Sequence, residues 1–309
     1  MDCVVTGGAG FIGSNLVDAL LARGDRVAVI DNLSTGRRAN LEGALAAGAI
    51  LHEIDVRDAD AVGEALAAAR PEVVFHMAAQ IDVRHSVDNP DADAAVNVLG
   101  TINVLGAARR AGARRLVNTS TGGGLYGDAE LLPTPEGHPI VPLAPYGQSK
   151  LAAEGYCDLF ARLFGLSTVS LRYGNVYGPR QDVHGEAGVV AIFCGCLVEG
   201  RAPTVFGDGR QTRDWVDVSD VVRANLLAAD APITGPVNIG HGRETSVLDL
   251  IEALNDVAGG HAPLAPLFEP ERAGEVRRSC LDVTRARREL GWGPTVSLRD
   301  GLRTILAGL

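Results

Sequence analysis

The hydrophobic pattern of the first 173 residues alternates between short apolar runs and longer amphipathic stretches. Apolar runs bounded by polar or glycine residues are typical of buried strands, and apolar residues repeated every three or four positions are typical of helices. The predicted strands cover residues 3–7, 26–31, 50–56, 72–78, 115–120 and 167–173, and the predicted helices cover residues 11–24, 58–69, 90–112 and 149–165. Buried strands separated by helices predict an α/β fold with a doubly wound parallel sheet.

This regular alternation ends after Tyr173. Residues 174–188, "GNVYGPRQDVHGEAG", are rich in glycine and polar residues, which indicates a functional loop. Beyond this loop, helices are expected near residues 187–199, 217–229 and 246–258, joined by short strands such as "TVFG" and "PVNIG". We therefore predict a first domain over residues 1–173 and a smaller, substrate-binding α/β lobe over residues 174–309, with some of its segments returning to the first sheet.

Bulk composition indicates a soluble globular protein. Of the 309 residues, 46% are hydrophobic and 21% are charged, as in ordinary globular domains. The formal net charge of -10 argues against a nucleic-acid partner and against an anionic membrane surface. The sequence has no apolar run of about 18 residues, and no basic segment followed by an apolar run near Met1. We therefore expect a cytoplasmic protein with no membrane partner.

The five cysteines are scattered along the sequence. Their odd number and irregular spacing do not indicate a disulfide framework, so we expect reduced thiols. Cys194 and Cys196 are close enough to be considered as metal ligands. Because they lie in the apolar run "VVAIFCGCLV", we interpret them as buried thiols and expect no metal site.

A glycine-rich turn joins the first predicted strand to the first predicted helix. In "TGGAGFIG", Gly7 permits a tight turn, Gly10 lets the backbone approach a pyrophosphate, and Gly13 lets the helix pack on the strand. The N-terminus of the helix would then face the anion. Asp31 ends the second strand, 18 residues past Gly13, where its carboxylate can accept the adenosine ribose hydroxyls and repel a 2′-phosphate.

This context predicts a Rossmann-type site for a dinucleotide cofactor. Asp31 favours NAD over NADP, because a carboxylate repels the additional phosphate of NADP. The neighbouring Arg37 and Arg38 are the counter-argument, since arginines hold such a phosphate in other proteins. NAD is the cofactor we expect.

Tyr146 and Lys150 stand four residues apart in "PYGQSK", at the start of a predicted helix. Residues at i and i+4 share one helix face, so the phenol and the ammonium group are expected to lie side by side. This spacing alone is common and is also typical of a surface pair with no chemical role. If the pair is catalytic, the ammonium group and a cationic nicotinamide both favour the phenolate and lower the tyrosine pKa from about 10 toward the working pH of a general base.

Ten stretches that together span residues 1 to about 295 carry a resemblance to a known family. They are "VTGGAGFIG", "DNLSTG", "EIDVRD", "VVFHMAAQ", "NVLGTINVL", "TSTGGGLYG", "PYGQSK", "LRYGNVYGPRQ", "VFGDGRQTRDWVDVSDV" and "NIGHGRETS". The sequence resembles the extended short-chain dehydrogenase/reductase family, in its NAD-dependent epimerase/dehydratase group, and within that group the UDP-glucose 4-epimerases. The resemblance implies a UDP-sugar substrate, tightly bound NAD and a transient 4-keto sugar. It also implies a homodimer whose four-helix interface is formed by residues 91–112 and 149–165.

The resemblance assigns the catalytic residues. It implies that Tyr146 transfers the proton and that Lys150 is its partner, which also holds the nicotinamide ribose. Thr121, or Ser120 beside it, matches the hydroxyl residue that bonds the reacting sugar oxygen. Relatives place this hydroxyl four positions before the tyrosine of a "YG" pair, where this chain has Gly122, and Thr121 is the better match. Dehydratases and decarboxylases of the family carry an acidic residue just after the hydroxyl residue, so the glycines here argue against both activities.

The remaining assignments also follow from the resemblance. Cofactor contacts are expected from Gly7, Gly10, Phe11, Ile12, Gly13, Asp31, Asn32, Ser34, Gly36, Asp55, Val56, Met77, Ala78, Ala79, Gln80, Asn97, Tyr146, Lys150 and Tyr173. Substrate contacts are expected from Thr121, Tyr146, Asn175, Val190, Thr204, Phe206, Arg213, Arg272 and Ser279. Arginine suits the diphosphate, because it bonds phosphate in bidentate fashion. Ser279 matches the position that limits space around the sugar 2-substituent, and its small side chain predicts that UDP-N-acetylhexosamines are also accepted.

Two alternatives remain open. A UDP-glucuronate 4-epimerase, or another nucleotide-sugar enzyme of the family, would need an arginine that binds the C6 carboxylate, and Arg84 and Arg180 are candidates. A non-catalytic NAD-binding regulator would be expected to lack the tyrosine and the lysine. Incubation with different UDP-sugars distinguishes these alternatives.

Overall fold

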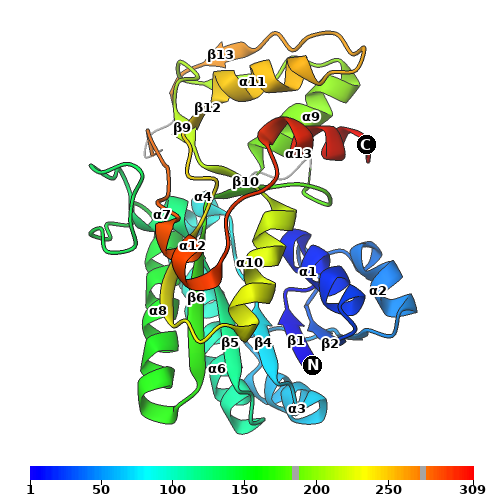
Figure 1. The fold of residues 1–309 in the computed structure, drawn as a ribbon, viewed down its shortest axis with the longest axis vertical. Helices are drawn as coiled ribbons and strands as arrows, with labels where there is room; N and C mark the ends of the chain where they lie inside the picture. The colour runs from blue at the N-terminus through cyan, green and yellow to red at the C-terminus, as the bar shows by residue number, and fades with distance from the viewer. Residues whose placement is uncertain (183–187, 272–275) are drawn as a thin grey trace.

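A sheet of seven parallel strands is the central feature of the computed structural model, which describes residues 1–182, 188–271 and 276–309 (Figure 1). In spatial order the strands are β11 (Gly235–Ile239), β6 (Ser167–Tyr173), β5 (Arg115–Thr121), β4 (Val73–His76), β1 (Asp2–Thr6), β2 (Arg26–Ile30) and β3 (Ile50–His52). Every neighbouring pair is parallel. The predicted doubly wound parallel sheet is confirmed.

Helices cover both faces of this sheet. One face carries α3 (Ala59–Ala69), α6 (Gly100–Arg110) and α8 (Pro145–Phe164), and the other carries α1 (Phe11–Ala22), α10 (Val218–Asp230) and α12 (Thr284–Leu290). The short η1 (Arg38–Leu41) and α2 (Glu42–Ala46) lie beside α1. A separate apolar core fills each interface, which explains why the strands are apolar along their whole length rather than alternating.

The strand order reverses between β1 and β4. The chain runs outward from β1 through β2 to β3, and then returns to start β4 on the other side of β1. In the register of these two strands, Thr6 lies opposite His76 at their carboxyl ends. Ligands of doubly wound proteins bind at such a reversal, outside the carboxyl ends of the strands.

A second lobe lies above the sheet in Figure 1. Its helices are α9 (Val189–Glu199), α11 (Val247–Asp256) and α13 (Leu298–Leu306), which share an apolar core. Its paired short strands are β7 (Asn175–Tyr177) with β10 (Trp215–Asp217), β8 (Thr204–Phe206) with β13 (Leu267–Glu269), and β9 (Thr212–Arg213) with β12 (Thr245–Ser246). Within the described ranges, no helix is both long and apolar enough to cross a membrane.

The structure differs from the sequence-based prediction at several elements, and two of them contain the predicted site residues Asn175 and Asn97. The predicted loop over residues 174–188 begins with strand β7, which forms because the Asn175 N–H donates to Asp214 O at 2.7 Å, a partner far along the chain. The predicted helix over residues 90–112 is divided into α5 (Pro90–Ala94), the π-helical turn η2 (Ala95–Leu99) and α6. Strand β11 belongs to the main sheet although it follows residue 174, and the domain boundary there stays a prediction.

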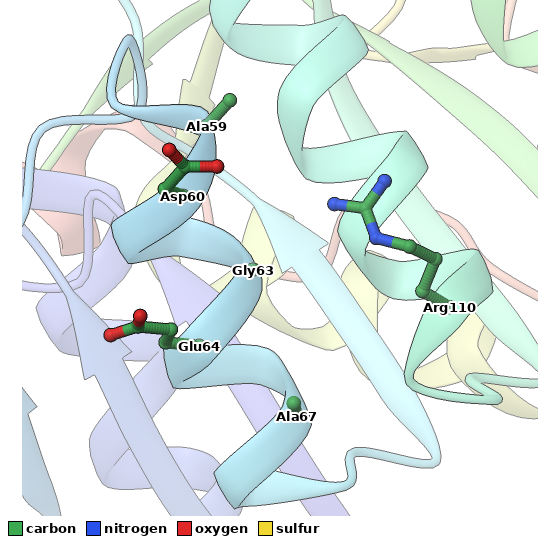
Figure 2. Close-up of a pocket in the computed structure, with 6 residues that line it drawn as sticks. All are labelled: Ala59, Asp60, Gly63, Glu64, Ala67 and Arg110. Atoms are coloured by element: carbon green, nitrogen blue, oxygen red, sulfur yellow. The ribbon is translucent and has the colours of Figure 1, made fainter.

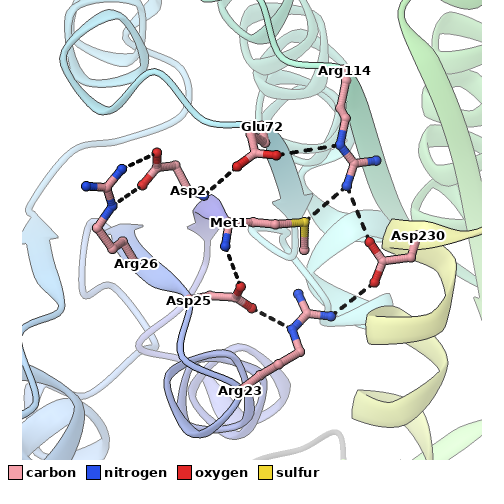
Figure 3. A network of polar contacts seen from close by, with 8 residues as sticks. All are labelled: Met1, Asp2, Arg23, Asp25, Arg26, Glu72, Arg114 and Asp230. Atoms are coloured by element: carbon pink, nitrogen blue, oxygen red, sulfur yellow. Dashed lines mark hydrogen bonds and ion pairs between the residues drawn. The ribbon is translucent and has the colours of Figure 1, made fainter.

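Charged groups link the chain segments at the amino-terminal ends of the sheet strands (Figure 3). The Asp25 carboxylate accepts hydrogen bonds from the Met1 amino group at 2.7 Å and from Arg23 Nε at 2.6 Å. Arg23 and Arg114 both reach Asp230 at the end of α10, at 3.2 and 3.3 Å. These contacts join the amino-terminal ends of the strands to α1 and α10, two of the helices on one face of the sheet.

Candidate active site

The glycine turn between β1 and α1 is shaped by close backbone contacts. Gly7 has a φ of +67°, in the left-handed region that favours glycine, and a Cβ there would lie 2.6 Å from the Ala78 backbone nitrogen. A Cβ on Gly13 would lie 2.1 Å from Gly7 O. Gly10 caps α1 without a side-chain hydrogen bond, and the first turn holds no acidic residue. The N–H groups at this helix end therefore suit an anion such as a pyrophosphate.

Asp31 is buried at the end of β2 and holds the turn in place. Its Oδ2 accepts the Ala9 N–H at 2.9 Å, and its Oδ1 accepts the Leu33 N–H at 2.8 Å. Both arginines that could have held a 2′-phosphate are paired with carboxylates. Arg37 pairs with Asp182 and Arg38 pairs with Glu53, each at 3.0 Å. The geometry therefore supports the prediction of NAD over NADP.

The residues expected around the adenosine form a connected polar cluster. Asn32 Nδ2 donates to Asp55 Oδ2 at 2.8 Å, and Ser34 Oγ donates to Asn32 Oδ1 at 2.7 Å. Arg57 hydrogen-bonds the Asp55 carboxylate and lowers its pKa to about 2. The other expected contacts of this region, Phe11, Ile12, Gly36 and Val56, lie in the first turn of α1 and in the loops after β2 and β3.

The loop after β4 completes the predicted cofactor side. Met77, Ala78, Ala79 and Gln80 are all half-buried. The Ala78 N–H donates to Thr6 Oγ1 at 3.2 Å, which fixes this loop against the end of β1. The Gln80 N–H donates to Asn97 Oδ1 at 3.0 Å, so the loop is also attached to the π-helical turn η2.

Tyr146 and Lys150 lie on the first two turns of α8, where Pro145 provides a favourable first helical residue. Lys150 is 4% exposed, and its Nζ donates to Thr119 O at 3.0 Å. The Tyr146 backbone N–H donates to the hydroxyl of Ser86 in α4 (Val83–Asp88) at 3.1 Å. The helix start is therefore held from both sides, which orients the phenol and the ammonium group.

Thr121 is the hydroxyl residue that reaches Tyr146. A Cβ on Gly124 would lie 3.4 Å from Thr121 Oγ1 and 3.4 Å from Tyr146 Cε1, so the two side chains lie next to each other. Thr121 Oγ1 also accepts the Gly124 N–H at 3.1 Å and so caps the short helix α7 (Gly122–Leu125). Ser120, by contrast, points to the other face of β5, where its Oγ donates to Glu154 Oε1 at 2.5 Å. Successive side chains of a strand point to opposite faces of the sheet, so only one of these two hydroxyls can face Tyr146. The structure favours Thr121 over Ser120 as the hydroxyl residue of the site.

The pKa values of both residues of the pair are shifted by burial. Burial raises the pKa of Tyr146 to about 12, while the Thr121 hydroxyl beside it opposes this shift. Burial also lowers the pKa of Lys150 to about 8. Desolvation of the phenol is the largest cause of the raised value, so the lowering that we expect from Lys150 and the nicotinamide together stays a prediction for the protein with NAD bound. A cationic nicotinamide beside Tyr146 would favour the phenolate.

Tyr173 lies at the end of β6 and is buried. Its hydroxyl donates to Asn225 Oδ1 at 3.0 Å, while Thr119 Oγ1 lies 3.5 Å away. Thr119 Oγ1 also donates to Met77 Sδ at 2.8 Å. Tyr173 is therefore brought into the same layer as the Met77 loop, as expected for a residue near the nicotinamide.

The predicted substrate residues fall into three groups. The first is Asn175, the second consists of Val190, Thr204 and Phe206 in the second lobe, and the third lies around Thr212. Asn175 lies next to the triple glycine, since a Cβ on Gly123 would be 3.7 Å from Asn175 Oδ1. Thr204 and Phe206 are half-buried in β8, whereas Val190 is 1% exposed and packs in the core of the second lobe. A direct contact of Val190 with the substrate is therefore not supported by its position.

The third group surrounds Thr212 of β9. Arg213 Nη1 donates to Thr212 O at 2.9 Å and to Val276 O at 2.8 Å. The Ser279 N–H also donates to Thr212 O, at 3.2 Å, and Ser279 is 7% exposed. The structure thus brings Arg213 and Ser279 together. Arg272 lies outside the described residues.

Asp214 is a residue that the sequence-based assignment missed. Its buried carboxylate accepts the backbone N–H groups of His241 at 2.6 Å, Gly242 at 3.1 Å and Leu281 at 2.9 Å. Burial raises the pKa of this carboxyl group. Asp214 therefore joins β10 to two segments of the second lobe, one of which carries Ser279. The quoted stretch "TRDWVDV" contains it, but its three partners are distant in sequence.

The sequence itself also matches a known family. Residues 3–240 match the model of the NAD dependent epimerase/dehydratase family. The chain belongs to this family. A UDP-glucose 4-epimerase of Mycolicibacterium smegmatis is 49% identical to it over 305 residues, which are 98% of this chain and 96% of that protein.

Solved structures agree with this assignment to the epimerase/dehydratase family. A UDP-glucose 4-epimerase from Thermotoga maritima with UDP-glucose is 44% identical, with a TM-score of 0.95 over 99% of this chain and 98% of that chain. A Thermus thermophilus UDP-glucose 4-epimerase in complex with NAD is 42% identical, with a TM-score of 0.91 and the same coverage of both chains. The glycine turn described above, which a Cβ at Gly7 or Gly13 would fill, fits the cofactor of the family.

A hollow of about 600 Å³ lies apart from these residues, between α3 and α6 (Figure 2). It is lined by Ala59, Asp60, Gly63, Glu64, Ala67 and Arg110. None of these is a predicted cofactor or substrate residue. Their mixed charges and open setting give no indication of a ligand.

Proposed function

We propose that this protein is a UDP-glucose 4-epimerase that interconverts UDP-glucose and UDP-galactose with tightly bound NAD. The observation that carries the proposal is the meeting of Tyr146, Thr121 and Lys150 at the edge of the sheet where the glycine turn lies. The named relatives, 42% to 49% identical over nearly the whole chain, support the choice of substrate.

The residues of the chain have distinct tasks in this reaction. Tyr146, as phenolate, takes the proton of the sugar 4-hydroxyl and later returns a proton to the 4-oxygen. Thr121 holds that oxygen through its hydroxyl. Lys150 has three N–H donors, of which one is used by Thr119 O, so others remain for the nicotinamide ribose. Bound NAD supplies the hydride acceptor, and afterwards the hydride donor, for C4 of the sugar.

Incubation with single UDP-sugars tests the proposed function. UDP-galactose, UDP-glucuronate and UDP-N-acetylglucosamine are each incubated with the protein without added NADH, and the ratio of epimers is measured. We expect turnover of UDP-galactose, and we expect Tyr146→Phe to lower it at least about a hundredfold while NAD binding is retained. The matched control is Tyr156→Phe, a half-buried tyrosine of the same helix. Equal turnover in Tyr146→Phe and Tyr156→Phe would contradict the assignment.

We also propose that the site admits an N-acetyl group at the sugar 2-position. The proposal is supported by the small side chain of Ser279, which is held beside Arg213 through Thr212. Ser279→Tyr should abolish turnover of UDP-N-acetylglucosamine and spare that of UDP-glucose, because added volume in a packed site costs about 1–3 kcal/mol. Wild-type protein that epimerises UDP-glucose but never the N-acetyl sugar would show that Ser279 does not set this limit.

The glucuronate alternative loses support at one of its two arginines. Arg180 Nη2 pairs with Asp18 at 2.5 Å, so its guanidinium is engaged on the outer side of α1. Arg84 lies in α4, and its backbone N–H donates to Asp82. We favour plain hexoses over glucuronate for this reason.

The assembly and the compartment are proposals as well. We infer a homodimer through residues 91–112 and 149–165, which is supported by the exposure of the apolar residues Leu99, Leu163 and Phe164. Light scattering of the purified protein tests it, and a monomer at micromolar concentration would contradict it. All five cysteines are free and buried, which supports the expected cytoplasmic location.

A further inference from the structure

Asp93 is a buried carboxylate that the proposed mechanism does not use. It lies in α5 and is 0% exposed. Its Oδ1 accepts hydrogen bonds from Gln80 Nε2 at 2.9 Å and from Asn97 Nδ2 at 3.0 Å. Its other oxygen, Oδ2, has no hydrogen-bond partner in the parts of the chain that the structure describes. A buried carboxylate in this state is unfavourable unless a cation lies near it.

Lys150 is a buried cation on this side of the site. Both α5 and η2 pack against α8, which carries Lys150. Of the carboxylates whose charge acts on this ammonium group, Asp93 acts most strongly. The other, Glu154, is already paired with Arg172 at 2.6 Å. Asp93 is therefore the carboxylate whose charge remains to balance Lys150.

Asp93 also organises the polar groups next to the site. The Gln80 N–H donates to Asn97 Oδ1, and Asn97 Nδ2 donates to Gln80 O at 2.9 Å, so these two residues form a closed pair. One oxygen of Asp93 holds both amides of this pair. Asn97 lies in the π-helical turn η2, and π-helical turns are frequent at functional sites.

We propose that Asp93 is a positioning residue of the active site, whose carboxylate balances the charge of the Lys150 ammonium and fixes the Gln80–Asn97 pair beside it. The kinetic test of this inference rests on the proposed function. The charge pairing itself is a property of the folded chain and can be tested without the reaction.

The effect of the Asp93 charge on the pH dependence follows from its sign. The charge raises the pKa of Lys150 and also that of Tyr146. Its removal therefore lowers both pKa values, and both limbs of the pH profile move to lower pH. We expect a shift of about one pH unit, which corresponds to an interaction of about 1.4 kcal/mol with one charge. His76 of β4 and Glu154 and Cys157 of α8 also interact with Lys150, and they are unchanged in the variant.

The first test compares two substitutions in the same helix. Asp93→Asn removes the charge but keeps an oxygen that can accept from Gln80 and Asn97. Asp91→Asn is the matched control, because Asp91 is exposed in α5. We expect the turnover profile of Asp93→Asn to move by about one unit to lower pH and that of Asp91→Asn to stay in place. An unmoved profile in Asp93→Asn would overturn the positioning role.

The second test is a double-mutant cycle in urea unfolding of the full chain, with the bound NAD content measured for each variant. It combines Asp93→Asn with Lys150→Met. When Lys150 is present, Asp93→Asn is expected to lower the urea midpoint, because the ammonium group is left unpaired. In the Lys150→Met background, the same substitution is expected to raise the midpoint or leave it unchanged, because no cation is left to pair with. Additive effects would overturn the proposal. If Asp93→Asn alone does not fold, recovery of folding in the double variant supports the pairing, and continued failure overturns it.

The two tests separate this inference from the proposed function. A wild-type protein without epimerase activity but with a non-additive cycle would refute the function and leave the pairing in place. A fully active wild type with an additive cycle and an unmoved profile would refute the role of Asp93 alone.

Discussion

At the scale of single residues, the direction of two neighbouring side chains determines which hydroxyl serves the reaction. Thr121 and Ser120 are adjacent in β5, yet Thr121 lies beside Tyr146 while Ser120 donates a hydrogen bond to Glu154 on the other face. Glu154 in turn pairs with Arg172 at 2.6 Å inside the protein. One hydroxyl therefore belongs to the site and the other to a buried structural network.

Substitution of the two hydroxyls separates these roles. Thr121→Val should lower turnover about tenfold to a hundredfold, the effect of a lost hydrogen bond to a charged group, and Thr121→Ser should restore most of it. Ser120→Ala should leave turnover near the wild-type value and lower the free energy of unfolding by about 1–3 kcal/mol, because Glu154 loses a buried donor. Steady-state kinetics and urea unfolding measure both effects. A larger loss of turnover in Ser120→Ala than in Thr121→Val would reverse the assignment.

At the scale of elements, the contact between α7 and α8 positions the catalytic tyrosine. A Cβ on Gly147 would lie 2.3 Å from Gly124 O, so the two helices meet backbone to backbone next to Tyr146. The glycines after Thr121 permit this close approach. Gly155 of the same helix has no atom within 4 Å of the position its Cβ would take.

This difference predicts opposite outcomes for the same substitution in α8. Gly147→Ala should push the start of the helix away from α7, lower the melting temperature and reduce turnover at least about tenfold, because small displacements of catalytic groups are costly. Gly155→Ala should raise the free energy of unfolding by up to about 1 kcal/mol through helix propensity and leave turnover unchanged. Thermal melts and initial rates decide the matter. Normal turnover in Gly147→Ala would show that the contact does not position Tyr146.

The elements that sequence predicts are those whose signal is local. Apolar runs predict six strands of the sheet, because the inner strands among them are buried on both faces. Strand β7 is missed because it depends on pairing with β10. The division of the 90–112 helix is missed because its π-helical turn leaves the apolar pattern intact. At the site, motifs predict Tyr146 and Lys150. Asp214 and Asp93 are missed because their partners come from separate segments.

At the scale of the whole molecule, the two edges of the sheet have different tasks. The carboxyl edge carries the glycine turn and the catalytic residues, while the amino edge is held by the charged contacts around Asp25 (Figure 3). Burial raises the pKa of Asp25, but hydrogen bonds from the Met1 amino group and Arg23 outweigh it and leave the pKa below its ordinary value. A carboxylate whose pKa is lowered by folding stabilises the folded state at pH values above the pKa that it has in the unfolded chain. This stabilisation is lost as the pH falls through the pKa that it has in the folded protein.

Asp25→Asn should therefore lower the free energy of unfolding at about pH 7 by about 1.5–3 kcal/mol, the effect of lost hydrogen bonds to a charged group. The difference from wild type should shrink as the pH falls below about 4. Asp230→Asn is the control, since its side chain is 56% exposed and its ion pairs should contribute less than about 1 kcal/mol. Urea unfolding at both pH values measures this. A constant difference at all pH values would contradict the linkage.

The measurement that tests the central proposal most directly follows the epimerisation from both sides. The protein is incubated separately with UDP-glucose and with UDP-galactose, without added NAD or NADH, and both sugars are quantified until the ratio is constant. We expect the two reactions to reach the same ratio with no net formation of NADH, because the same site oxidises and then reduces C4. No conversion from either sugar, or a one-way accumulation of an oxidised product, would contradict it.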